Sequence, residues 1–228
     1  MVETRIEGGI ARIFLNRPEK SNALNTSMLE ALLQAIRQLE QARVVVLAGQ
    51  GKAFCGGADV NELKSLDATN AGRFVERIHE VCAAFRALPI PVVAHLHGAV
   101  IGAGLEIAAA CDLRIAEQGT RFSMPEVRLG IPSVVEAALL PRLMGQGRAA
   151  WLVLTGDAID ARRAYEWGLV EEIGGRAELE ALVARLAAND GPALKMQKQL
   201  LQLWEEAPLS QSIAASVEQF AAAYARKK

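Results

Sequence analysis

One carboxylate stands inside a long neutral segment of this 228-residue chain. Glu106 is the only acidic residue between Ala94 and Cys111, a stretch rich in alanine, glycine and aliphatic residues. Burying an ionised carboxylate without a partner is costly, so such a group either finds compensation or keeps its proton. A carboxyl group with a raised pKa is what general acid/base chemistry near neutral pH requires. Glu106 is therefore a candidate catalytic residue.

A second acid, Glu126, follows twenty positions later, directly after Met124 and Pro125. Pro125 can open a helical turn, whose free N–H groups and dipole would help to hold a carboxylate. Two carboxylates beside a polarised carbonyl group could bind and activate one water, one acting as base while the other supplies a proton. The alternative for Glu126, an ordinary charge at a helix start, stays open at this point.

Two glycine-rich turns provide candidate donors for such a carbonyl oxygen. Residues 53–59 follow one predicted strand, and residues 98–104 follow another. Small residues let a ligand approach the backbone, so the N–H groups of Ala58 and Ala103 could converge as an oxyanion hole. Glu106 lies three positions after Ala103, about one helical turn, and so on the same helix face. Two tight strand-to-helix turns without a ligand are the competing interpretation.

Apolar periodicity predicts the elements that position these residues. Alternating residues on either side of Gly8 and Gly9 predict a β-hairpin, and the later alternation of strands and helices is typical of an α/β core with a parallel sheet. Beyond about residue 133 the pattern is almost entirely helical, with one strand near 169–173. The predicted strands cover 2–6, 10–15, 43–48, 92–96, 113–116 and 121–123, and the predicted helices cover 27–41, 70–88 and a segment starting near 102.

Composition excludes several classes of protein. With 25 basic and 26 acidic residues, the chain has no electrostatic reason to bind nucleic acid or an anionic membrane. No apolar run reaches the roughly 20 residues of a membrane span, and the N-terminus lacks the apolar region of a signal peptide. Three cysteines without metal spacing indicate reduced core thiols in a cytoplasmic protein. We also expect the three histidines to be structural rather than metal ligands.

Several motifs, in order along the chain, resemble the enoyl-CoA hydratase/isomerase family, the crotonases. These are LNRPEKSNALN at 15–25, GKAFCGGADVNEL at 51–63, PIPVVAHLHGAVIGAGLEIAAACDLRIA at 89–116, FSMPEVRLGIP at 122–132 and LTGDAIDARRAYEWGLVEEI at 154–173. The resemblance implies a crotonase-like spiral of ββα units at 1–173 and a helical C-terminal region at 174–228. That region would serve oligomerisation, as a homotrimer or a dimer of trimers, and the coenzyme A pocket.

The resemblance also implies a reaction and a site. Glu106 and Glu126 match the two catalytic glutamates of the hydratases, and Ala58 and Ala103 match the oxyanion-hole positions. The implied activity is that of a lyase of fatty acid metabolism, an enoyl-CoA hydratase that adds water across the 2,3 double bond of a 2-enoyl-CoA. No metal or cofactor is expected, because coenzyme A is part of the substrate. The implied substrate contacts are Lys20, Ala23, Leu24, Ala58, Asp59, Val60 and Gly102. Lys20 and Arg17 are candidate phosphate contacts, and the alternative that both are solvated surface charges stays open.

Three features depart from the family pattern: the segment after Ile131, which includes Glu136, the residue at position 103, and the end of the chain. The segment from Ile131 to Arg142 replaces a glycine-rich stretch, so Val134 and Val135 are expected to reshape the acyl pocket. Glu136 adds a third acid, either for an isomerase-like proton transfer or, as we expect, for pairing with an arginine such as Arg142. Ala103 stands where hydratases often have glycine. The chain is also expected to end before the family's last helix.

Two other functions stay open from sequence alone. One is a double-bond isomerase that uses Glu126 or Glu136. The other is a non-catalytic acyl-CoA-binding subunit, which the altered segment after Ile131 and the expected short C-terminus would suit.

Overall fold

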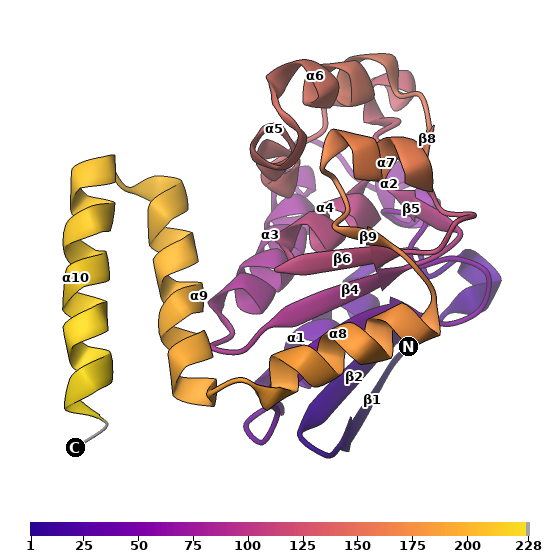
Figure 1. Ribbon diagram of the computed structural model, residues 1–228. Coiled ribbons are helices and arrows are strands. Elements are labelled where there is room, and N and C mark those ends of the chain that lie inside the picture. The colour runs from indigo at the N-terminus through magenta and orange to yellow at the C-terminus, as the bar shows by residue number, and fades with distance from the viewer. Residues whose placement is uncertain (227–228) are drawn as a thin grey trace.

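The computed structural model describes residues 1–226 and opens with the predicted hairpin (Figure 1). Strands β1 (Val2–Glu7) and β2 (Ile10–Leu15) pair antiparallel, with Glu7 opposite Ile10. The two-residue turn consists of Gly8 and Gly9, both at positive φ. Such a turn needs positive φ at both central residues, which is why the glycine pair predicted it correctly.

The hairpin forms one edge of a six-stranded sheet with the order β1-β2-β3-β4-β6-β9, parallel from β2 onward. The predicted strands of this sheet are confirmed, apart from the last. Its pairing covers only two residues. Just before it, the Leu169 carbonyl and the Glu171 carboxylate bind the buried guanidinium of Arg114. The remaining strands are β3 (Val44–Gly49), β4 (Val92–Leu96), β6 (Leu113–Ala116) and β9 (Glu172–Ile173).

Helices cover both faces of this sheet (Figure 1). In β3, Val45 and Leu47 join the main core, while Val44 and Val46 face a smaller cluster. Because side chains alternate along a strand, this continuous apolar run buries both faces. The main core packs α1 (Thr26–Arg37), α3 (Ala71–Ala87) and α4 (Ala103–Ala110), and the smaller cluster packs α8 (Arg176–Ala188).

After β4, and again after β6, the chain enters a second sheet of three strands. Strand β5 (Ala99–Ile101) pairs parallel with β7 (Arg121–Ser123), which pairs antiparallel with β8 (Ile159–Asp160). The sequence predicted β7, but it predicted residues 98–104 as a turn only and no strand near 159. Strands of two or three residues are too short to show alternation, so only the partner strand defines them.

Short helical elements connect the sheets and carry the loops around the candidate site. The elements are η1 (Pro18–Lys20), α2 (Val60–Lys64), η2 (Glu126–Leu129), η3 (Val135–Leu139), α5 (Leu140–Met144), α6 (Gln146–Thr155) and α7 (Ala161–Trp167).

The last two helices form an antiparallel hairpin that projects from the core (Figure 1). Helix α9 (Gly191–Glu206) attaches through Lys198, which is only 5% exposed. Its Nζ lies 2.7 Å from Asp112 Oδ2 and 3.0 Å from the Ile90 carbonyl oxygen. Asp112 also accepts a hydrogen bond from the Val92 N–H, 2.7 Å away. One buried ion pair therefore connects the hairpin to the start of β4.

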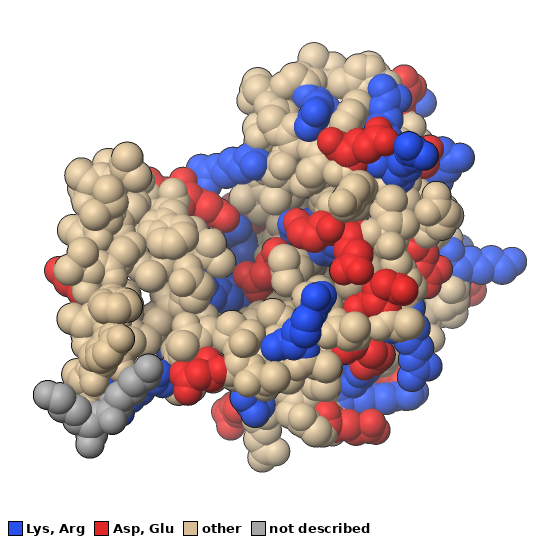
Figure 2. Space-filling model, viewed as in Figure 1, with Lys and Arg blue, Asp and Glu red and all other residues tan. Residues whose placement is uncertain are grey.

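Helix α10 (Leu209–Ala225) leaves much of its apolar surface exposed. Charged atoms are sparse on this arm of the molecule (Figure 2). The exposed side chains recur about every fourth residue, so they share one helix face. They are Leu209, Ile213, Val217, Phe220 and Tyr224, each at least 56% exposed.

Two further predictions concern the three cysteines and membrane-spanning segments. Cys55, Cys82 and Cys111 are buried and form no disulfide, which confirms their interpretation as core thiols. Within residues 1–226 no helix combines the length and the apolarity that crossing a bilayer demands.

We expect Lys198→Met to destabilise the protein. The substitution keeps an unbranched side chain but leaves the partly buried Asp112 carboxylate without its cation, at a cost of about 2–3 kcal/mol. Urea unfolding measures the difference. Lys195→Met, which changes an exposed lysine of the same helix, is the control and should be nearly neutral. Equal stability of the two variants would show that Lys198 does not anchor the hairpin.

Candidate active site

The two glycine-rich turns lie against each other, backbone to backbone. Cys55 and Val100 form a parallel bridge, in which the Cys55 N–H donates to the Ala99 carbonyl and the Ile101 N–H donates to the Cys55 carbonyl, each at 3.0 Å. Gly57 has φ +93°, and a Cβ at this position would lie 2.9 Å from the Ile101 carbonyl oxygen. Glycine is therefore required here both for its conformation and for the close approach.

The backbone on either side of Ala58 is oriented by hydrogen bonds to Leu24. The Leu24 N–H donates to the Gly57 carbonyl, and the Asp59 N–H donates to the Leu24 carbonyl, both at 2.8 Å. In a trans peptide the C=O and N–H groups point in opposite directions, so the Ala58 N–H points away from Leu24. The second turn is close at this point, since a Cβ on Gly57 would lie 3.9 Å from the Ala103 nitrogen.

Ala103 is the first residue of α4, where N–H groups have no acceptor within the helix. The helix dipole adds a preference for negative charge at this end. Gly102 before it has φ +51°, and its N–H donates to the Ser123 carbonyl at 3.0 Å. The prediction that Ala103 opens a helix is confirmed.

Glu126 is the first residue of η2, directly after Pro125. Its Oε1 packs so closely over Gly102 that a Cβ on Gly102 would overlap it. Its Oε2 accepts a hydrogen bond from Ser133 Oγ at 2.9 Å. The carboxylate is therefore held beside the first turn of α4, although it lies on a different element.

Glu106 lies on α4, all eight residues of which are buried. The side chain is only 4% exposed, and its Oε1 lies 3.3 Å from the Ala137 nitrogen. Burial, and then the charge of Glu126, raise the pKa of Glu106 to about 8, while the Ala137 amide acts in the opposite direction and the charge of Glu136 adds to the rise. At neutral pH Glu106 is therefore mostly protonated. The two acids predicted from spacing are close enough to influence each other's charge.

The expected pairing of Glu136 with Arg142 is wrong. Glu136 is 7% exposed, and its Oε1 lies 2.8 Å from Nδ1 of His79 on α3. Arg142 instead approaches Glu205 on α9 at 3.7 Å. Glu136 and His79 are 57 positions apart, so only the packing of η3 on α3 brings them together.

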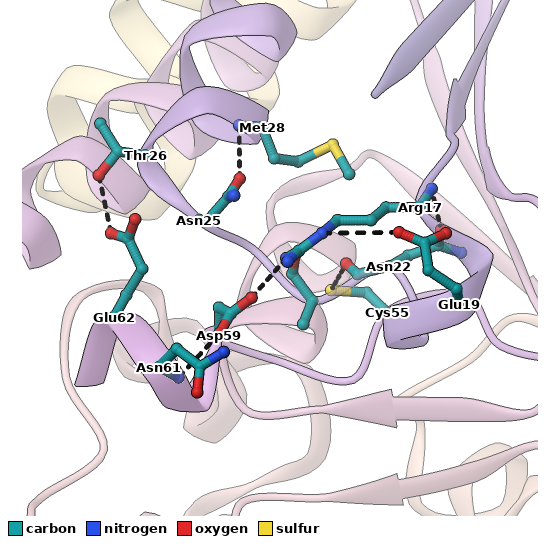
Figure 3. A network of polar contacts seen from close by, with 11 residues as sticks. Arg17, Glu19, Asn22, Asn25, Thr26, Met28, Cys55, Asp59, Asn61 and Glu62 are labelled. Carbon is teal, nitrogen blue, oxygen red and sulfur yellow. Dashed lines mark hydrogen bonds and ion pairs between the residues drawn. The ribbon is translucent and has the colours of Figure 1, made fainter. Parts of the chain in front are cut away.

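The predicted coenzyme A loop contains an ion pair that the sequence did not indicate (Figure 3). Arg17 Nη1 lies 2.5 Å from Asp59 Oδ2, and the same nitrogen donates to the Ala23 carbonyl at 3.1 Å. Asp59 also caps α2 by accepting from the Asn61 N–H. The hydrogen bond from Arg17 is the main reason that the pKa of Asp59 is lowered. The Arg17 guanidinium is thus bound by Ala23 and Asp59 rather than exposed as a free phosphate ligand.

The other predicted substrate contacts differ in their accessibility. Lys20 is exposed in η1, and Val60 is 59% exposed at the start of α2. Leu24 is completely buried, so it can support the Ala58 turn but its side chain presents no surface to a ligand. The side chains of Lys20 and Val60 stay exposed, whereas the N–H of Asp59 is bonded to Leu24 and its carbonyl to Leu63.

Two residues that sequence reasoning missed support the site. Ser133 holds Glu126 through a hydrogen bond. The only hint of this in the sequence was that Ser133 lies in the altered segment, seven residues after Glu126. Asn22 is fully buried at φ +55°, and its Nδ2 donates to the carbonyl groups of Gln50 and Ala53 at 2.9 and 2.8 Å. Asn22 therefore fixes the turn that leads to Ala58. Its place inside the NALN motif was the only available signal.

An apolar cleft of about 620 Å³ lies beside the altered segment. Ser133, Val134 and Val135 line one side, and Ala149 and Val153 of α6 line the other. Ser133, which holds Glu126, is one of the lining residues, whereas Glu106 and Glu126 themselves do not line the cleft. Among residues 1–226, no group of three histidine, cysteine or acidic side chains is arranged to bind a metal ion.

Comparison with known proteins identifies the family and the fold. The family model described as enoyl-CoA hydratase/isomerase matches residues 5–228. A short-chain-enoyl-CoA hydratase of Clostridium acetobutylicum is 33% identical over 223 residues, which cover 94% of this chain and 85% of that protein. The crystal structure of an enoyl-CoA hydratase from Thermoplasma volcanium superimposes with a TM-score of 0.95 at 31% identity, covering 98% of this chain and 92% of that one.

A Mycobacterium smegmatis enoyl-CoA hydratase structure gives a TM-score of 0.94 at 31% identity, covering 97% of this chain and 90% of that one. The fold is thus the crotonase fold, as the sequence motifs predicted. The chain belongs to the enoyl-CoA hydratase/isomerase family.

We expect the stability of the protein to fall as pH rises from about 4.5 to about 8, the interval between the ordinary and the folded pKa of Glu106. The folded state binds this proton more tightly than the unfolded state, so the contribution is present at low pH and lost through this window. Glu106→Gln removes it, and at about pH 9 the variant should exceed the wild type by on the order of a few kcal/mol.

Urea unfolding at several pH values tests this expectation. Glu76→Gln, at an exposed position of α3, is the control and should keep the wild-type pH dependence. Parallel pH profiles for wild type and Glu106→Gln would contradict the assignment of a raised pKa to Glu106.

Proposed function

We propose that the protein is an enoyl-CoA hydratase. The observation that carries the proposal is the placement of two acids, Glu106 and Glu126, beside the first turn of α4, with the Ala58 and Ala103 turns in contact. The N–H groups of Ala58 and Ala103 would bind the thioester oxygen of a 2-enoyl-CoA. They would stabilise the negative charge that develops there as water adds to the double bond.

The two acids would divide the handling of water. Protonated Glu106 would donate a hydrogen bond to the water oxygen and orient it toward C3. Glu126, as a carboxylate, would take a proton from this water as its oxygen bonds to C3, and would then deliver that proton to C2. The oxyanion formed on the thioester collapses back to the carbonyl, and Glu126 returns to its starting state. No cofactor takes part in this sequence.

Substrate binding would use the exposed parts of the predicted contact set. The exposed Lys20 would bind a phosphate group of coenzyme A, and the exposed Val60 at the start of α2 would lie along its extended arm. The cleft lined by Val134 and Val135 offers an apolar space for the acyl chain beside Ser133. The absence of any disulfide among the three buried cysteines agrees with a cytoplasmic location.

A second candidate function is a double-bond isomerase, which one observation favours. Glu136 is a third acid, buried near Glu106, and hydration needs only two. Incubation with 2-enoyl-CoA and 3-enoyl-CoA, followed by mass measurement, separates the activities, because hydration adds one water and isomerisation leaves the mass unchanged. Efficient isomerisation without hydration would reject the first proposal, and tight binding without turnover would indicate a non-catalytic subunit.

We expect Glu126→Gln to lower the hydration rate by roughly 10²–10⁴-fold, because the amide cannot carry the proton from water to C2. Folding should change little, since the amide oxygen can still accept the Ser133 hydrogen bond. Steady-state kinetics with a short 2-enoyl-CoA gives the rate, and circular dichroism confirms the fold. Glu76→Gln serves as the matched control. A fully active Glu126→Gln variant would remove this residue from the mechanism.

We further propose that copies of the chain assemble as a homotrimer or a dimer of trimers through the C-terminal hairpin. The apolar face of α10 supports this, because a row of exposed aliphatic and aromatic side chains is typical of an interface. Light scattering should give a mass of three or six times the 24.5 kDa chain. Val217→Lys should lower that mass, whereas Glu218→Lys, at the next exposed position, should not. A wild-type protein of one chain would contradict the proposal.

A further inference from the structure

Glu136 is a buried acid with an incomplete set of partners. Its Oε1 is bound by His79, but its Oε2 is buried and has no hydrogen-bond partner among the described residues. His79 itself is 57% exposed, so the pair runs from the surface into the interior. A buried carboxylate with one oxygen left without a partner is expensive, and an arrangement of this kind is therefore a candidate for a role beyond packing.

The groups around Glu136, and around Glu106 beside it, come from α3, α4 and η2. Helix α3 contributes His79 and the Cys82 thiol, whose pKa is raised by burial first and then by the charges of Glu136 and Glu106. Helix α4 contributes Glu106, and η2 contributes Glu126, whose charge acts on Glu106. His79 is the only cation-forming group among these neighbours. The site is therefore a cluster of acids with one partner at its outer edge.

One short segment connects these elements to one another. The side chain of Glu136 binds α3 through His79, and the N–H of the next residue, Ala137, faces Glu106 on α4. On the other side of Glu136, Val135 has φ +39°, a conformation that a β-branched residue rarely adopts. Such a conformation persists only where the surrounding contacts hold it. The two contacts at Glu136 and Ala137 are the ones in position to do so.

We propose that Glu136 is a positioning residue that, together with His79, holds the 134–139 segment over Glu106. The inference rests on the proposed function, in which protonated Glu106 orients water. It explains why a hydratase would keep a third acid that takes no part in proton transfer. The charge of Glu136 acts in the same direction as burial and as Glu126, so a neutral residue at 136 should make Glu106 easier to ionise.

The first test measures the titration of Glu106 directly, without turnover. Carbon-13 NMR of protein labelled at the glutamate carboxyl carbons follows each acid against pH, and Glu106→Gln identifies the resonance of Glu106 by its loss. In Glu136→Gln, which keeps the shape and the acceptor oxygen for His79, the midpoint should move to lower pH. An unchanged midpoint would overturn the proposal.

Substitutions at His79 separate positioning from folding, because this side chain is exposed and tolerates change. In His79→Asn the amide nitrogen can replace Nδ1 as donor, so the Glu106 midpoint should stay at its wild-type value. In His79→Phe the donor is lost, the 134–139 segment that helps to bury Glu106 loses its attachment to α3, and the midpoint of Glu106 should fall as in Glu136→Gln. Identical behaviour of the two His79 variants would contradict the proposed pairing.

Activity provides a second, independent readout. If Glu106 must be protonated, kcat for hydration declines as pH rises through its midpoint, and this limb should shift to lower pH in Glu136→Gln and His79→Phe but not in His79→Asn. If the wild type hydrates no 2-enoyl-CoA, the proposed function fails while the titration shifts still decide the positioning role. If hydration occurs but its pH limb is the same in all variants, the positioning role fails alone.

Discussion

The close approach of two backbone turns is the constraint on which the candidate site depends. Cys55 and Val100 pair directly, and Gly57 leaves no space in which a side chain could separate the two turns. This contact brings the N–H of Ala58 and the start of α4 into one neighbourhood although they lie 45 positions apart. The buried Asn22 holds the first turn, and the strand pairing of β5 holds the second. The glycines are therefore needed for their small volume as much as for their conformations.

Burial then determines the chemistry of the acids. A carboxyl group inside an alanine-rich helix is held against ionisation by its surroundings, and neighbouring negative charge strengthens this effect. Glu126 is in a different environment, because it is partly exposed and accepts a hydrogen bond from Ser133. Two acids with different environments can divide the roles of proton acceptor and water-orienting donor. The altered segment after Ile131 contributes to both environments, since it supplies Ser133 and Ala137.

The C-terminal hairpin follows a different principle from the core. It attaches through the buried pair of Lys198 and Asp112, and α10 makes few contacts with the rest of the chain apart from α9. An arm that buries so little of its own apolar surface gains stability only when something else covers it. We propose that a second copy of the chain covers this surface. Assembly of the protein would then be coupled to the folding of α10.

Much of this protein could be predicted from its sequence, because the decisive patterns were local. The hairpin followed from two glycines between alternating residues, and β3 followed from a short continuous apolar run. Glu106 stood out as a charge without a neighbour in an apolar helix, and Glu126 was found because Pro125 marks a helical start. In each case a few adjacent residues determine the backbone conformation or its burial, so no distant contact was needed to recognise them.

Only the tertiary structure could decide the pairings between distant residues. The sequence suggested Arg142 as the partner of Glu136, whereas the packing of η3 on α3 places His79 there. It suggested a phosphate ligand in Arg17, whereas the fold pairs that guanidinium with Asp59. The strands β5 and β8 are too short to carry a periodic signal, and they exist because β7 offers them hydrogen bonds. Charge and hydrogen-bonding capacity are visible in a sequence, but the partner that satisfies them is determined by which elements pack together in space.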